Sequence, residues 1–164
     1  MAYMNSDGLL KKYGTEKAIP TLGGDFVTLG ETRNAEFTIN LATLNATPQV
    51  LSDVTFFMQG VFVEQVDVVD EVAAVGGTSF SVGLIGLDRT TVSSNTAFVA
   101  ALPLASYDST GEKTVLNKGT TGAGTLIGTT TPVAGYVTAI AAGTFTAGVV
   151  KVRIKYRGLP GITR

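Results

Sequence analysis

A run of alternating apolar and basic residues near the end of this 164-residue sequence constrains the fold most strongly. The apolar positions are Val150, Val152, Ile154 and Tyr156, and the basic positions are Lys151, Arg153, Lys155 and Arg157. Side chains of a strand alternate between its two faces, whereas a helix would scatter both sets around its circumference. The pattern therefore predicts a strand over residues 149–157 that closes a sheet, with an apolar inner face and a basic outer face.

Other segments with strand-like composition precede this strand, at residues 36–42, 54–69, 79–86, 114–116, 125–127 and 133–141. Gly60 inside the second segment predicts a bulge or bend. Ala142 and Gly143 predict a turn that makes a hairpin of the last two strands. Polar residues at 93–95, followed by apolar residues and Pro103, predict one short helix over residues 96–102.

About seven or eight short strands with a single helix are typical of all-β domains. We therefore expect an antiparallel β-sandwich or a jelly-roll-like barrel with one short helix and an extended N-terminal arm. The expected division of the chain is an arm over residues 1–30 and a β-sandwich domain over residues 31–164.

The first 30 residues carry little periodicity and are interrupted by glycine and proline. A loosely ordered terminus is one interpretation. The other is an arm that packs on a neighbouring subunit, because the segment is more apolar than a disordered tail usually is. Its candidate partner-binding residues are Leu9, Leu10, Tyr13, Ile19, Leu22 and Phe26.

The composition favours a protein that buries surface in an assembly. Hydrophobic residues make up 45% of the chain and charged residues only 15%. The longest apolar run, residues 97–105, is far shorter than the roughly 20 residues that a membrane-spanning helix needs. The N-terminus shows no secretory signal pattern. Such a chain is expected to cover its remaining apolar surface by contact with other proteins.

The residue types in this chain do not favour an enzyme. The absence of His and Cys removes the usual nucleophile–base pairs and the commonest metal ligands. The glycine-rich segment 119–124 lacks the lysine of a phosphate-binding loop. Glu64 and Asp67 would point to opposite faces of a regular strand, which is unsuitable for a pair of catalytic carboxylates. We therefore expect no enzyme, no cofactor and no metal site.

The basic outer face of residues 149–157 has four interpretations. It could bind a phosphate or an acidic partner, make a subunit contact, or discourage pairing at a sheet edge. It could also be neutralised by cross-strand pairing with Glu64, Asp67, Asp70 or Glu71. The formal net charge of −1 argues against a specific nucleic-acid partner. A protein contact is the favoured role for Lys151, Arg153, Lys155 and Arg157.

Three stretches resemble structural proteins of tailed-bacteriophage virions, particularly capsid decoration (cement) proteins. They are the small-residue strand at residues 77–83 with the segment that follows it to 102, the Gly/Thr-rich stretch before Pro132, and the ending at residues 145–156. The resemblance implies a β-rich subunit, often a homotrimer, that binds the major capsid protein at the capsid surface after synthesis in the host cytoplasm. It implies no cofactor and no membrane association.

Two other functions stay open. The first is a different virion position, as a tail-tube, adaptor or head-fibre subunit. The second is a carbohydrate-binding β-sandwich, for which Tyr107 and Tyr136 would be the aromatic candidates. The absence of Trp argues against the second.

Overall fold

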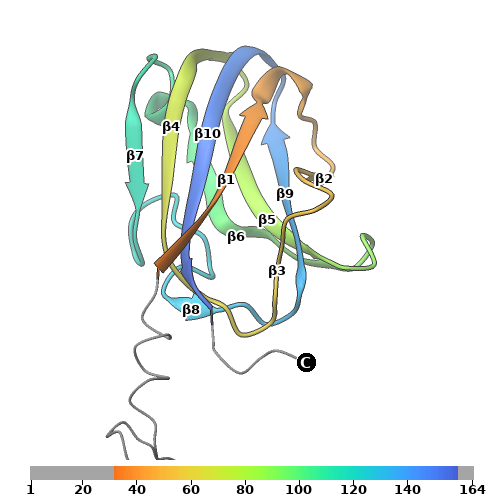
Figure 1. The fold of residues 1–164 in the computed structure, drawn as a ribbon. Helices are drawn as coiled ribbons and strands as arrows, with labels where there is room; N and C mark the ends of the chain where they lie inside the picture. Colours follow the sequence, from red (N-terminus) through yellow and green to blue (C-terminus); the bar gives the residue numbers. More distant parts are fainter. Residues whose placement is uncertain (1–31, 159–164) are drawn as a thin grey trace, which may run out of the picture. The chain divides into compact units, whose positions relative to one another are not determined.

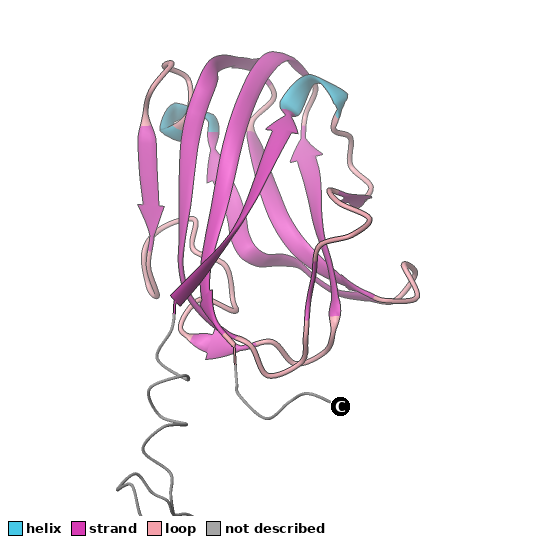
Figure 2. Ribbon diagram, in the orientation of Figure 1, coloured by secondary structure: helices cyan, strands magenta, loops and turns pink. Residues whose placement is uncertain are grey.

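The computed structural model describes residues 32–158 of the chain, and these residues form two packed β-sheets (Figures 1 and 2). The elements of the described part, in chain order, are β1 (Thr32–Asn40), η1 (Leu41–Thr43), β2 (Gln49–Val50), β3 (Phe56–Phe57), β4 (Phe62–Gly76), β5 (Ser79–Gly86), β6 (Val92–Pro103), η2 (Leu104–Ser106), β7 (Lys113–Leu116), β8 (Thr129–Thr130), β9 (Gly135–Ala142) and β10 (Phe145–Arg157).

Both sheets are antiparallel, and the chain passes back and forth between them. Sheet A has the order β1-β10-β4-β7, with β8 also paired to β4. Sheet B has the order β2-β9-β5-β6, with β3 also paired to β9. Two antiparallel five-stranded sheets packed on each other form a β-sandwich. The expected all-β sandwich is confirmed.

The alternating terminal segment lies in β10, and its apolar side faces the other sheet. Val150, Val152 and Ile154 are fully buried, while the four basic residues lie on the outer face. β10 pairs with β1 on one side and with β4 on the other. It is therefore an inner strand of sheet A, and the interpretation of its charges as protection of a sheet edge is wrong.

The core is built from the inner faces of both sheets. Phe37 and Ile39 come from β1, and Phe80, Val82 and Leu84 come from β5. Aromatic contacts join the sheets: the ring of Phe57 lies 4.9 Å from that of Tyr156. The buried ring of Tyr107 packs edge-on against Phe80 at 5.0 Å. Alternation in the sequence thus marks β1, β5 and β10 among the strands that supply the core.

The predicted short helix is wrong, because residues 96–102 belong to strand β6. The only helical elements of the described residues are the short 3-10 turns η1 and η2. The hydroxyl of Ser94, expected to cap a helix, accepts a hydrogen bond from the N–H of Thr96 at 3.2 Å inside an irregular strand. Long-range pairing with β5 and with residues 122–126 overrides the local signal.

Two predicted connections also differ from the structure. Gly60 (φ +85°) lies in a turn that carries the chain from β3 in sheet B to β4 in sheet A, instead of a bulge inside one strand. The turn at residues 142–144 likewise joins β9 of sheet B to β10 of sheet A. The last two strands are therefore no hairpin. Period-two patterns identify strands but carry no information about which sheet each strand joins.

Candidate functional site

The outer face of sheet A carries the basic residues that the sequence singled out. Strand register places side chains from four strands in rows across this face. One row runs from Glu36 through Arg153 and Asp67 to Val115, and the next contains Lys151 and Lys113. Basic side chains of β10 thus lie between the acidic side chains of β1 and β4.

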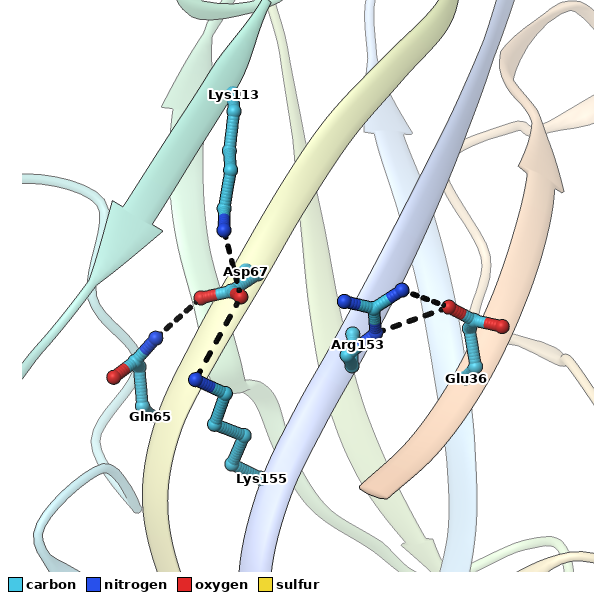
Figure 3. A network of polar contacts seen from close by, with 6 residues as sticks. All are labelled: Glu36, Gln65, Asp67, Lys113, Arg153 and Lys155. Carbon is cyan, nitrogen blue, oxygen red and sulfur yellow. Dashed lines mark hydrogen bonds and ion pairs between the residues drawn. The ribbon is translucent and has the colours of Figure 1, made fainter.

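Each basic side chain of β10 has an acidic partner on this face. The closest N–O distances are 3.1 Å for Lys151–Glu71, 2.6 Å for Arg153–Glu36, 4.0 Å for Lys155–Asp67 and 2.5 Å for Arg157–Glu64. The pair of Arg153 and Glu36 includes two hydrogen bonds to one carboxylate oxygen, shown in Figure 3. The alternative of cross-strand pairing therefore describes this face, although Asp70 takes no part and Glu36 was not foreseen.

Asp67 is the centre of the network. Its carboxylate is 1% exposed and accepts a hydrogen bond from the side-chain amide of Gln65 at 2.5 Å. The ammonium groups of Lys113 and Lys155 lie 3.2 and 4.0 Å from it, as Figure 3 shows. Burial acts to raise the pKa of Asp67, but the hydrogen bonds and the two positive charges outweigh it and lower that pKa.

Because its basic side chains are held in ion pairs, this face is poorly suited to bind a phosphate. A phosphate site needs cationic groups that are free to contact the ligand. Here the carboxylates already compensate the positive charge, and the side chains of Lys151, Arg153, Lys155 and Arg157 are between 35% and 42% exposed. Protein contact through this face stays a prediction.

A register shift brings Glu64 onto the same face as Asp67. The pairing of β4 with β10 slips by one residue between Lys155 and Tyr156, so that Val63 turns inward and Glu64 outward. The expectation that these two carboxylates lie on opposite faces is therefore wrong. Both are held in ion pairs, and the described residues contain no group of three or more Asp, Glu, His or Cys placed to hold a metal ion.

Replacing Asp67 with Asn is expected to lower the free energy of unfolding by about 2 kcal/mol at pH 7, because charged hydrogen bonds to a buried group are lost. Because folding lowers the pKa of Asp67, its stabilising effect is present above pH 3.8, the ordinary pKa. The effect is lost as the pH falls through the lower pKa of the folded protein. Urea titrations at pH 7 and pH 3 measure the difference, which should shrink in acid.

Glu36→Gln is the matched control, because it breaks an ion pair between side chains that are about 40% exposed. Its expected cost is under about 1 kcal/mol. Equal costs for the two substitutions would show that Asp67 does not organise this face.

A second surface, which the sequence reasoning missed, is apolar. Phe56, Met58 and Val133 are 40–45% exposed, and Val54 is 84% exposed. β3 pairs with β9, and the ring of Phe56 packs edge-on against Tyr136 at 5.9 Å. We call Val54, Phe56, Met58 and Val133 the apolar cluster. The spacing of Val54, Phe56 and Met58 at every second position was its signal in the sequence.

The remaining candidates fall in different places. The six arm residues lie outside the described part of the chain. Tyr107 is completely buried, and its hydroxyl donates to the carbonyl of Leu102 at 3.2 Å, so it is unavailable to a carbohydrate. Tyr136 has the guanidinium of Arg89 over its ring at 4.5 Å. Among residues 32–158 no helix is long and apolar enough to span a membrane.

Comparison with solved structures identifies the same fold in phage capsids. A chain in the capsid of Ralstonia phage GP4 has a TM-score of 0.52 and 12% identity, with 92% of each chain covered. A chain in the acidic stable capsid structure of Helicobacter pylori bacteriophage KHP30 has a TM-score of 0.50 and 17% identity, covering 77% of this chain and 87% of that one. The predicted resemblance to phage virion proteins is confirmed in the fold.

Sequence comparison adds no closer relation. No protein-family model matches the chain, and no curated protein matches it.

Proposed function

We propose that this chain is a structural protein of a tailed-bacteriophage virion and acts as a decoration, or cement, subunit of the capsid. The observation that carries the proposal is the match to a chain of the Ralstonia phage GP4 capsid over 92% of both chains. The similarity extends over nearly the whole length of each chain.

The chemistry of the described surface supports a binding role. The face of sheet A is charged but internally compensated, and the apolar cluster is exposed. A surface with exposed apolar side chains and with compensated charges suits a contact with another protein better than one with a polyanion. In this proposal the major capsid protein is the partner, and the subunit acts as a homotrimer on the capsid surface.

The proposal is tested by banding phage particles on a density gradient and measuring this chain against the major shell protein. Near-stoichiometric amounts on DNA-filled heads support decoration. A few copies per particle indicate a tail, adaptor or head-fibre subunit. Absence from particles rejects a virion role, and glycan binding is then the function to test.

The N-terminal arm supplies a prediction about attachment. Deleting residues 1–24, or replacing Leu9 and Leu10 with Asp, is expected to lower the number of copies bound per particle at least about tenfold, because each subunit loses one of its linked contacts. Binding of the purified protein to undecorated heads, followed by sedimentation, measures the loss.

The matched control changes charge in the same segment and keeps its apolar side chains: Lys11→Ala with Lys12→Ala should bind as the unaltered chain does. Thermal unfolding of every variant checks that the β-sandwich is intact. Undiminished attachment of the deletion variant would show that the arm is not part of the contact.

A further inference from the structure

Asp70 occupies a position that the charged network does not explain. It follows Asp67 by three residues on β4, but it points to the opposite side of sheet A. Its partner on β10 is the buried Val150, and it shares the inward parity of Val66 and Val68. The residue is 1% exposed, and neither oxygen of its carboxyl group makes a hydrogen bond of normal geometry.

The segment of residues 107–112, between η2 and β7, lies alongside β4 at this position, and we call it the covering segment. Its backbone is hydrogen-bonded to Asp70 itself and to Ala74. The N–H of Asp70 donates to the carbonyl of Glu112 at 2.9 Å, and the N–H of Gly111 donates to the carbonyl of Asp70 at 2.7 Å. Ala74 donates to the carbonyl of Tyr107 at 3.2 Å. The covering segment is thus attached to β4 through hydrogen bonds at Asp70, the residue with the buried carboxyl group, and at Ala74.

Among the described residues, the charged groups that act on Asp70 are both acidic. Asp108 and Glu112 belong to the covering segment, and residues 104–112 contain no Lys or Arg. The nearest basic residues along the chains lie on the outer face with other partners: Lys113 with Asp67, and Lys151 with Glu71. No cation therefore compensates Asp70 from the covering segment, from β4 or from β10.

An ionised carboxylate without a partner is strongly disfavoured in a protein interior. Burial raises the pKa of Asp70, and the negative charges of Glu112 and Asp108 raise it further, against a smaller opposite effect of the Val72 N–H. The folded arrangement therefore favours the neutral acid. The contribution of Asp70 to the stability of this arrangement is fully present below pH 3.8, the ordinary pKa. It is lost as the pH rises through the raised pKa of the folded protein.

We propose that Asp70 and the covering segment 107–112 form a proton-operated latch. With a proton on Asp70, the segment packs on β4 as the structure shows. Loss of that proton places a third negative charge beside Asp108 and Glu112, and the segment is released from β4 while the rest of the sandwich stays folded. The latch is independent of whether the chain binds a capsid.

Amide hydrogen exchange of the full-length protein between pH 4 and pH 8, corrected for the intrinsic rate, tests the latch. Protection of the Gly111 and Ala74 amides should fall at least about tenfold as pH rises, because a buried charged group without a hydrogen-bond partner destabilises the closed arrangement by more than about 1 kcal/mol. Amides at the centre of β10 report global opening and should keep their protection over this range. In Asp70→Asn the protection of residues 107–112 should not depend on pH.

Two further variants make the result specific. Glu112→Gln removes one of the two repelling charges and should reduce the fall in protection, even if Asp70→Asn proves unable to fold. Asp67→Asn, on the outer face, should leave the fall unchanged. Protection that does not change with pH in the unaltered chain, or that changes equally in Asp70→Asn, would overturn the proposal.

The alternative to a proton on Asp70 is a metal ion bound by its carboxylate. Addition of millimolar CaCl2 at pH 8 is expected to leave the exchange of residues 107–112 unchanged. Protection restored by calcium in the unaltered chain but not in Asp70→Asn would overturn the assignment to a proton and show that the position binds a metal ion.

Discussion

Phe98→Ala is expected to destabilise the domain by about 4 kcal/mol, because truncating a buried Phe loses its transfer free energy and leaves a cavity. Phe98 is fully buried in β6, and its ring lies 5.4 Å from that of Phe57. The two rings come from opposite ends of sheet B, where β6 and β3 lie outside β5 and β9. Chemical denaturation with urea measures the loss, together with a melting temperature lowered by roughly 10 °C or more.

Val115→Ala provides the comparison on the surface of sheet A. Val115 is 39% exposed on β7, so its truncation should cost less than about 1 kcal/mol. A loss at Phe98 as small as that at Val115 would mean that residues 96–102 do not pack into the core as a strand.

Gly124→Ala is expected to cost about 3 kcal/mol or more, because the added methyl group would overlap backbone atoms. A Cβ at this position would lie 2.3 Å from the carbonyl oxygen of Ala97 and 2.4 Å from the carbonyl carbon of Phe98. Backbone atoms inside a paired segment cannot move aside as the end of a flexible side chain does. Thermal unfolding and loss of hydrogen-exchange protection at the Leu126 amide, which donates to Ala97, measure the effect.

Gly158→Ala is the matched control, since a Cβ there would meet no atom within 4 Å. Its expected effect is within about 0.5 kcal/mol. If the two alanine substitutions behaved alike, the close approach of residue 124 to β6 would not exist in solution.

The sequence predicted the strands that alternate and have one buried face. Phe37 and Ile39 in β1, Phe80 and Val82 in β5, and the apolar side of β10 all lie in the core as expected. The prediction failed in β6, where Ala97, Phe98 and Val99 are consecutive buried residues. A strand buried on both sides shows no alternation, and short apolar runs do not distinguish such a strand from a helix.

The glycine-rich stretch illustrates a second limit. Residues 119–124 belong to the connection between β7 and β8, and a Cβ at Gly119 would meet no atom within 4 Å. Gly124, five residues later, is buried against the backbone of β6. Composition identifies both glycines as residues of a connection. Only the long-range packing shows that Gly119 is exposed and that Gly124 must be glycine, because backbone atoms of β6 approach it closely.

The candidate site was predictable in part. Alternation placed the four basic residues on one face, and Glu64, Asp67 and Glu71 were among the acidic residues expected to pair with them across strands. Glu36 pairs with Arg153 although 117 residues separate them, and only the register of β1 against β10 brings them together. Asp70 was grouped with Asp67, yet its parity along β4 turns it to the opposite face.

The position of β10 has a consequence for the order in which the domain forms during synthesis. β10 is the last described strand to be translated, yet it lies between β1 and β4 in sheet A. Until residues 145–157 have left the ribosome, β1 has no neighbour, and β4 exposes the edge that β10 later covers. The nascent chain thus holds an incomplete sheet through most of its translation, a state in which unpaired edges favour association with other chains.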